Sequence, residues 1–395
     1  MVQRKILLGW EMGGGLGHVI PLQRIGERLK ALGHHVVYCV QNQATALKVG
    51  MDRGELRQAP HWTHRAQQPP LPPGYSGFTF GQILALFGVG ERETTARMLR
   101  EWTALLEAER PDVVVSDFAP GLNLAARGRY PLLVFGNGYT HPPDHLDAFP
   151  RLWPTDAKPY YDEAALLESL DALLSSEGRP RLERFPAIMA GDASAVRTFP
   201  LLDPYRAFRK APTLAPILSH VPSPIMEPGE EILCSILPRF AESPEVLRAL
   251  ASLDLPGRLL ASALGEGLIA PFEQTPWRIE RTIVDFGPHL RSFRMVIGYG
   301  GLGLTSLALA AGLPQLILYT DSEKLLTGRA LEHAGVARAF HYRRIETETL
   351  VKTAARLYVD PQIHARAREL ARAHAPLLAS DPITSVADMV QGLLS

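Results

Sequence analysis

The alternation of apolar and polar positions along the chain predicts two α/β units that follow one another. In the first half, short apolar runs alternate with segments of helical period, as in 22–32, where leucine and isoleucine recur on one face of a helix that ends at Gly33. This alternation is typical of a parallel sheet whose strands are joined by crossover helices. The strands expected in this half lie at 6–10, 35–40, 112–116 and 132–135.

The second half repeats the same rhythm from residue 232 onward. The stretch 199–231 between the halves is rich in proline and keeps no period, so we interpret it as an inter-domain linker, with the boundary near 225. The predicted domains are 1–225 and 226–375, followed by a helix over 376–395 that could cross back to the first domain. The elements expected in the second half are strands at 232–237, 258–263, 278–284, 295–298 and 315–319 and helices at 243–253 and 305–311.

Length and charge agree with this division and narrow the range of partners. The 395 residues exceed the size at which one hydrophobic core usually keeps growing, which favours two domains. Lys plus Arg and Asp plus Glu both number 41, so the net charge is zero and no overall field favours nucleic acid or an anionic membrane as partner. The oligomeric state stays open.

The N-terminal segment and the two cysteines indicate the compartment. The first apolar run stops at Glu11, too early for a signal peptide and far too early to span a bilayer, so we expect a cytoplasmic protein without stable membrane insertion. Cys39 and Cys234 lie far apart in apolar segments and have no metal-ligand spacing, which favours free thiols.

The first glycine-rich turn, GGGLGH at 13–18, lies between a strand and a helix, where backbone amides can approach an anion. A nucleotide-hydrolase phosphate loop needs Lys and Ser or Thr after the last glycine, but His18 and Val19 stand there. A dinucleotide fingerprint needs a third glycine where His18 stands and an acid after the second strand, and both are missing. Both phosphate-binding interpretations of this turn are therefore weakened.

The second glycine-rich turn, within GYGGLGLTSLALAAGLP at 298–314, is a better phosphate site. It places Gly300, Gly301 and Gly303 between an apolar strand and a helix, so its amides, with the hydroxyls of Thr305 and Ser306, could hold a diphosphate at a helix N-terminus. A tight strand-to-helix connection without a ligand would have the same sequence, and this alternative stays open.

The two turns together resemble a known family. A glycine-rich turn ending in Gly-His after the first strand, and YGGLGLTSLALAAGLPQLILYTDSEKLLTGRALEHAGVA in the second half, are similar to the two-domain nucleotide-sugar glycosyltransferases of the macrolide, antibiotic and plant UDP-glycosyltransferase group. The resemblance covers both halves in order and little of the middle third. It implies the GT-B fold, two Rossmann-like domains with parallel sheets facing across a cleft, with the sugar donor held by the second domain and the acceptor by the first.

The resemblance also implies a catalytic pair without a metal or other cofactor. In the family a histidine of the first loop takes the proton of the acceptor hydroxyl and an aspartate orients it; the matching residues here are His18 and Asp117. Histidine has a suitable proton affinity for this step, and Asp117 follows an apolar strand, at the edge where open α/β sheets place ligands. The alternatives are structural: His18 bonded to its own backbone, and Asp117 as the N-cap of the next helix.

Departures from the family pattern leave the donor open. The family usually has His at Tyr299, Thr at Leu304, Glu at Leu307 and Gln at Lys324, and the missing acid at 307 commonly bonds the nucleotide ribose. Either the donor is unusual or donor binding has been lost. The donor-binding residues carried over from the resemblance are Gly17, Ser235, His289, Tyr299, Gly300, Gly301, Gly303, Thr305, Glu323 and Lys324.

We therefore predict a metal-independent, inverting glycosyltransferase that moves a hexose-type sugar from a UDP- or TDP-sugar to an acceptor hydroxyl. The nucleotide-diphosphate sugar is a co-substrate, and the acceptor is expected to be a small or lipid-like molecule. The aromatic and proline-rich segment 62–80 suggests an apolar or ring-bearing acceptor, but an exposed loop that covers the core would have the same sequence. A non-catalytic auxiliary protein of the same fold and, further off, a nucleotide-sugar epimerase are the alternatives. The exact identities of the sugar and of the acceptor stay open.

Overall fold

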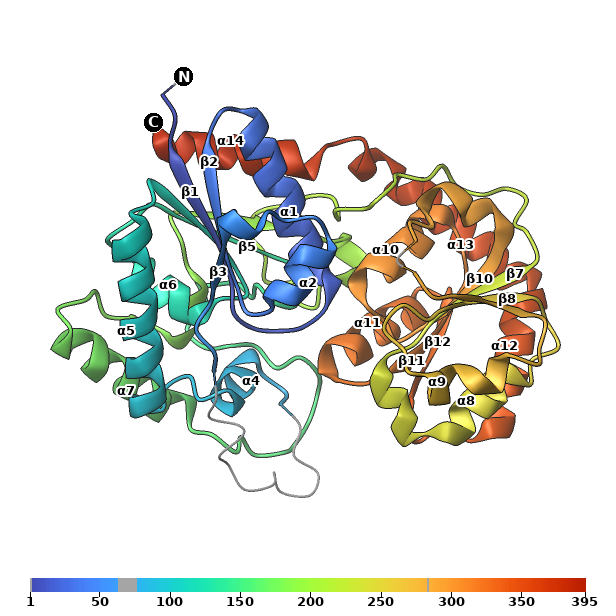
Figure 1. Cartoon of the computed structure of the whole chain (residues 1–395). Helices are drawn as coiled ribbons and strands as arrows, with labels where there is room; N and C mark the ends of the chain where they lie inside the picture. Colours follow the sequence, from blue (N-terminus) through green and yellow to red (C-terminus); the bar gives the residue numbers. More distant parts are fainter. Residues whose placement is uncertain (1, 63–76, 283) are drawn as a thin grey trace. The chain divides into compact units, whose positions relative to one another are not determined.

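The computed structural model describes residues 2–62, 77–282 and 284–395, which form two compact units (Figure 1). Unit 1 comprises Met1–Thr198, Asp203–Leu214 and Asp381–Ser395, and unit 2 comprises Phe199–Leu202 and Ala215–Ser380. The sequence predicts a boundary near 225 and a returning helix over 376–395. Each unit is described by itself below.

Unit 1 is built on a sheet of parallel strands in the order β3-β2-β1-β4-β5-β6. The four strands predicted in this half are present, each with ends within one residue of those expected. The strands β3 and β6 were not predicted, because they are only three and four residues long and carry no clear apolar pattern. The strands are β1 (Lys5–Trp10), β2 (His35–Val40), β3 (Leu56–Gln58), β4 (Val113–Asp117), β5 (Leu132–Gly136) and β6 (Ala193–Val196).

Helices cover the sheet of unit 1 and bury its apolar strands. Leu22, Ile25 and Leu29 of α1 are fully buried, as their spacing predicts. The C-terminal helix α14 packs against α1 and against β4 to β6, so the chain end belongs to this unit (Figure 1). The helices are α1 (Leu16–Ala31), α2 (Gln43–Lys48), α4 (Phe80–Leu86), α5 (Arg92–Glu109), α6 (Pro120–Ala126), α7 (Glu163–Ser176) and α14 (Pro382–Leu394), with short 3-10 turns η1 (Arg53–Glu55) and η2 (Phe185–Met189).

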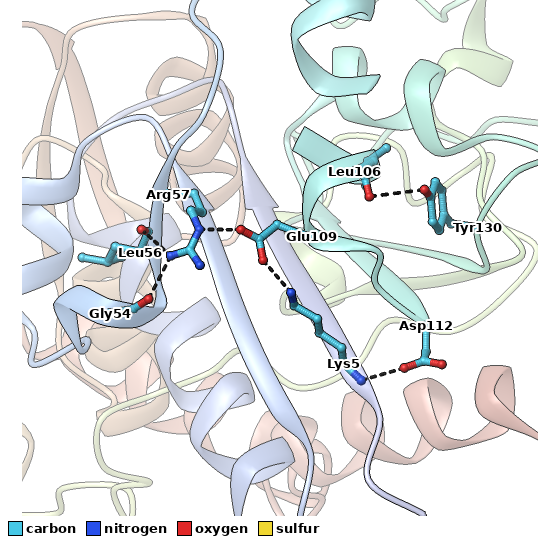
Figure 2. A network of polar contacts seen from close by, with 8 residues as sticks. All are labelled: Lys5, Gly54, Leu56, Arg57, Leu106, Glu109, Asp112 and Tyr130. Carbon is cyan, nitrogen blue, oxygen red and sulfur yellow. Dashed lines mark hydrogen bonds and ion pairs between the residues drawn. The ribbon is translucent and has the colours of Figure 1, made fainter. Parts of the chain in front are cut away.

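Ion pairs fasten unit 1 near the amino ends of its strands (Figure 2). Glu109, at the end of α5, accepts from Lys5 of β1 at 2.6 Å and from Arg57 of β3 at 2.5 Å. Asp112 accepts from the backbone amide of Lys5 at 2.7 Å and from the Arg4 guanidinium at 3.0 Å. These contacts join β1, β3, α5 and the start of β4 at the edge of the sheet opposite to the carboxyl ends of the strands.

Unit 2 repeats the architecture of unit 1, with parallel strands in the order β12-β11-β10-β7-β8-β9. All five strands predicted in this half are found, but the expected strands 258–263 and 278–284 are shorter in the structure, and β12 was not predicted. The strands are β7 (Glu231–Ser235), β8 (Gly257–Leu260), β9 (Trp277–Glu280), β10 (Phe293–Gly298), β11 (Gln315–Tyr319) and β12 (Ala337–His341).

The helices of unit 2 cover its sheet, and both predicted ones are present. The expected helix 243–253 is α8 (Pro244–Ala251), and the expected helix 305–311 is α10 (Leu302–Ala311), which begins one turn earlier. No helix in the described part of the chain is long and apolar enough to cross a membrane. The other helices are α9 (Glu266–Ile269), α11 (Ser322–His333), α12 (Thr347–Val359) and α13 (Pro361–Leu378), with 3-10 turns η3 (Pro200–Leu202), η4 (Pro238–Glu242), η5 (Ala270–Phe272) and η6 (Gly287–Ser292).

Counted within each unit, the strand order is 3-2-1-4-5-6 in both, the order of the Rossmann fold. In such a sheet the connections leave in opposite directions from the first and fourth strands, and ligands bind outside their carboxyl ends. The switch points of this protein therefore lie between β1 and β4 in unit 1 and between β7 and β10 in unit 2. The predicted fold class, two Rossmann-like α/β domains, is confirmed.

Candidate active site

The catalytic pair expected from the sequence lies at the switch point of unit 1. Asp117 is the last residue of β4 and is paired in register with Trp10, the last residue of β1. His18 lies in the first turn of α1, which follows β1. The Nδ1 atom of His18 is 3.0 Å from Oδ2 of Asp117, so the structure brings together two residues that are 99 positions apart in the sequence.

The surroundings of His18 fix its tautomer and orientation. Asp117 is completely buried and only 8% of His18 is exposed, so the bond between them is shielded from water. An ionised carboxylate accepts only, and Nδ1 of His18 therefore donates, which leaves Nε2 without a proton and able to accept one. The ring is stacked on Trp10, with centroids 5.4 Å apart and an angle of 14° between the planes.

The first glycine-rich turn makes room for this ring. Gly13 has φ of 81°, and a Cβ atom at this position would lie only 2.5 Å from Nε2 of His18. A Cβ on Gly14 or Gly17 would meet nothing within 4 Å. The turn thus places a residue without a side chain beside the nitrogen that would accept the proton.

The structural alternative for Asp117, a role as N-cap of the next helix, is not found in the structure. The N-cap of α6 is Ala119, without a side-chain bond, so Asp117 does not cap this helix. The oxygens of Glu11 accept instead from the amides of Gly121, at 3.0 Å, and of Leu122. Because Glu11 accepts from the amides of α6, the Asp117 carboxylate is left to bond His18.

Sequence reasoning missed Glu11, which it used only as the end of the first apolar run. Glu11 follows β1 directly and is 3% exposed; burial raises its pKa to about 7, against hydrogen bonds from Trp62, Gly121 and Leu122 that lower it. An acid directly after an apolar strand is the signal that selected Asp117, and it could have selected Glu11 as well.

Arg197 is a second residue at this edge that the sequence did not reveal. It follows β6 directly, is 5% exposed, and donates from Nη2 to the carbonyl oxygen of Gly17 at 2.9 Å. Its guanidinium lies over the ring of Phe135, 5.0 Å from the centroid. The expected donor-binding residue Gly17 is therefore held through its carbonyl by a buried cation. Because β6 was not predicted, nothing marked Arg197 as the residue after a strand.

The glycine-rich turn of unit 2 lies at the corresponding switch point. Ser235, the last residue of β7, is paired in register with Gly298, the last residue of β10. Gly300 has φ of 85°, and a Cβ atom there would lie 3.0 Å from Cγ2 of Ile317 and 3.3 Å from Cβ of Lys324. Gly301 precedes α10, and a Cβ on Gly303 would meet nothing within 4 Å, so the first turn of this helix is open to a ligand.

Tyr299, Glu323 and Lys324 gather around this turn. A Cβ on Gly301 would lie 2.7 Å from the Tyr299 ring, which therefore covers that glycine. Lys324, in the first turn of α11, bonds Oε2 of Glu323 at 2.5 Å and lies 3.8 Å from Asp321. Burial lowers the pKa of Lys324, but the carboxylates of Glu323 and Asp321 outweigh it and raise that pKa above its ordinary value. The lysine is thus a charged, paired residue.

Other residues expected at the donor site lie away from the glycine-rich turn or have buried side chains. His289 is exposed in η6, ahead of the amino end of β10, whereas the glycines follow its carboxyl end. Thr305 and Ser306 are 2% and 0% exposed, so their hydroxyls are not accessible to a ligand in this structure. Leu307, where the family has an acid, packs in the core of unit 2. Most of the segment 62–80 lies outside the described residues.

Known proteins resemble the chain along its whole length, although no protein-family model matches it. It is 23% identical to a UDP-N-acetylglucosamine–N-acetylmuramyl-(pentapeptide) pyrophosphoryl-undecaprenol N-acetylglucosamine transferase of Phenylobacterium zucineum over 402 residues, 96% of both chains. It is 25% identical to demethyllactenocin mycarosyltransferase of Streptomyces fradiae over 407 residues, 96% of this chain and 84% of the relative.

Solved structures match the fold of both units. The spinosyn rhamnosyltransferase SpnG complexed with thymidine diphosphate superposes with a TM-score of 0.67 at 20% identity and covers 98% of this chain and 100% of its own. The resemblance to two-domain glycosyltransferases of the macrolide and antibiotic group, inferred from the sequence, is therefore confirmed, and the fold of this chain is theirs.

Proposed function

We propose that this protein is a glycosyltransferase that moves a hexose-type sugar from a nucleoside-diphosphate donor to a hydroxyl group, with His18 as general base. The observation that carries the proposal is the buried bond between Nδ1 of His18 and Oδ2 of Asp117 at the switch point of unit 1. A weakly acidic hydroxyl nucleophile needs a general base. A histidine can serve as this base when its Nδ1 is bonded to a carboxylate and its Nε2 carries no proton.

The proposed step is a single displacement at the anomeric carbon. As the acceptor oxygen forms its bond to that carbon, Nε2 of His18 takes the hydroxyl proton, and the bond between the anomeric carbon and the diphosphate oxygen breaks. Asp117 then stabilises the imidazolium that results. Proton transfer of this kind contributes about 10²- to 10⁴-fold to the rate. Because attack and departure occur on opposite faces of the carbon, the configuration inverts.

The proposed donor is a UDP- or TDP-sugar held by unit 2. The open space at Gly303 in the first turn of α10 supports this, because amides at a helix N-terminus favour a diphosphate and stabilise it as it leaves. The proposal includes no metal, since these amides would take the role that a cation has elsewhere. Two similar proteins point to the two nucleotides: one is named for a UDP-sugar, and the other was solved with thymidine diphosphate.

Glu323 is proposed to accept from hydroxyls of the donor sugar. It lies in the first turn of α11 and its oxygen is bonded to Lys324, which fixes the carboxylate beside the turn that holds Gly300. In this arrangement Lys324 supplies a positioned partner for Glu323, where the family commonly has an amide. Ser235 at the end of β7 would add a phosphate contact.

Calorimetry with UDP, TDP and GDP, followed by turnover of the matching sugar donors, tests the proposal. We expect UDP or TDP to bind below millimolar concentration, and the His18→Ala variant to bind nucleotide normally but to lose transfer. His35→Ala, which removes an exposed histidine of the same unit, is the control. Absence of nucleotide binding by the folded protein would favour a non-catalytic auxiliary role, and conversion of the donor sugar without an acceptor would favour an epimerase.

A further inference from the structure

Glu11 is a buried acid that the proposed mechanism does not use. It lies directly after β1 and only 3% of it is exposed, yet its two oxygens accept hydrogen bonds from three N–H groups. These donors are the amides of Gly121 and Leu122 in the first turn of α6 and Nε1 of Trp62, the last at 2.7 Å. A carboxylate with this many donors is an organised contact between segments rather than a chance burial.

The segments that Glu11 joins are those that carry the catalytic pair. Glu11 lies between β1 and α1, whose first turn holds His18, and Gly121 lies in the first turn of α6, which follows Asp117 at the end of β4. The amide of Met12 donates to the carbonyl oxygen of Phe118 at 3.1 Å, which is a second bond between the two connections. The distance between His18 and Asp117 therefore depends on how these connections are tied to each other.

The local backbone is also arranged around the carboxylate. A Cβ atom on Gly121 would lie 2.9 Å from Oε1 and 3.2 Å from Oε2 of Glu11, so only glycine allows this approach. Phe118, between Asp117 and α6, has φ of 47°, a left-handed conformation that non-glycine residues rarely adopt and that persists only where neighbouring contacts impose it.

We propose that Glu11 is a positioning residue: its carboxylate fastens the first turn of α6 to the connection after β1 and so holds Oδ2 of Asp117 at hydrogen-bond distance from Nδ1 of His18. The effect of this contact on catalysis rests on the proposed function. The geometric claim does not, because the bond between His18 and Asp117 can be observed without a substrate.

Nitrogen-15 NMR of the His18 imidazole tests the geometric claim, with the signal assigned by its absence from His18→Gln. In the unaltered protein we expect the tautomer with hydrogen on Nδ1. Glu11→Ala should give a mixture of tautomers, and Asp117→Asn should give one too. Gly121→Ala should also give a mixture of tautomers, because the new methyl group displaces the Glu11 carboxylate although Glu11 itself is unchanged. Glu109→Gln, which breaks ion pairs at the opposite edge of the sheet, should leave the signal unchanged.

Glu11→Gln separates positioning from general stability. The α6 amides of Gly121 and Leu122 bond to different oxygens of Glu11, so the single glutamine oxygen can accept from only one of them, and the NH₂ group faces the other without accepting. We expect thermal stability close to that of the unaltered protein, because relief of the buried charge offsets the lost hydrogen bond, and a kcat lower by about 10- to 100-fold at similar KM.

The outcomes are distinct. An unchanged His18 signal in folded Gly121→Ala and Glu11→Gln proteins overturns the proposal even if Glu11→Ala does not fold. If the losses in kcat across these variants are proportional to their losses in thermal stability, the catalytic role proposed for Glu11 is overturned. If the unaltered protein transfers no sugar at all, the proposed function fails, and the His18 signal still decides whether Glu11 positions the pair.

Discussion

Asp117 ends β4 with its carboxylate bonded to His18 at 3.0 Å, while the helix that begins three residues later takes its capping carboxylate from Glu11 instead. The two acids lie at the carboxyl ends of neighbouring strands of one sheet, and each has a different role. This division leaves Asp117 available to orient the imidazole. The first prediction concerns that bond.

Asp117→Asn should lower kcat by between about 10²- and 10⁴-fold, because the amide cannot hold the charge of the imidazolium and permits the wrong tautomer. Donor binding should stay unchanged, since unit 2 is unaltered. Steady-state kinetics with saturating donor measures this. Asp112→Asn, at the other end of β4, is the matched control and should retain kcat. Equal losses in both variants would show that the effect is one of stability.

Gly13→Ala should impair transfer, whereas Gly14→Ala should have little effect. The new methyl group at residue 13 would lie 2.5 Å from Nε2 of His18, and φ of 81° adds strain of about 1 kcal/mol or more. At residue 14 the methyl group meets nothing within 4 Å. Activity and thermal melting of the two adjacent variants measure the difference. Full activity in Gly13→Ala would contradict the placement of Nε2.

Gly303→Ala should bind nucleotide more weakly without loss of stability. The methyl group has free space in the structure, and alanine within a helix is favoured over glycine by up to about 1 kcal/mol. A diphosphate at the first turn of α10 would, however, meet that methyl group. Melting without ligand should be unchanged or higher, and calorimetry should give a raised Kd. An unchanged Kd would place the diphosphate elsewhere.

Glu109→Gln should lower stability near neutral pH by about 1 kcal/mol, with a difference that shrinks in acid. Burial raises the pKa of Glu109, but hydrogen bonds from Lys5 and Arg57 outweigh it, so the folded pKa is lower than the unfolded one. Stability from such a group is present above the unfolded pKa and is lost as pH falls through the folded pKa.

Urea unfolding at several pH values checks the Glu109 prediction. Glu107→Gln is the control, because its pair with Arg129 is largely exposed and lies on the same helix. A stability difference for Glu109→Gln that stays constant from neutral pH to far below the ordinary pKa of a glutamate side chain would mean that the carboxylate charge is not its source.

The fold was predictable wherever a strand was long and apolar. The strands β1, β2, β4 and β5 carry runs that are buried on both faces of a parallel sheet, and such runs are visible in the sequence. The edge strand β3 and the short strand β6 were missed, because their stability comes from pairing with a neighbour rather than from their own pattern.

For the candidate site, the sequence by itself determined the residue types and the strands that they follow: a histidine after β1, an aspartate at the end of β4 and glycines after β10. Only the tertiary structure decided how they are used. In the folded chain Glu11 bonds the amides of α6, which leaves Asp117 to bond His18. Arg197, which follows β6, donates to the carbonyl oxygen of Gly17. The reason is physical: a strand's sequence fixes its own burial, but which side chains meet at the sheet edge depends on strand order, and that order arises only when the sheet assembles.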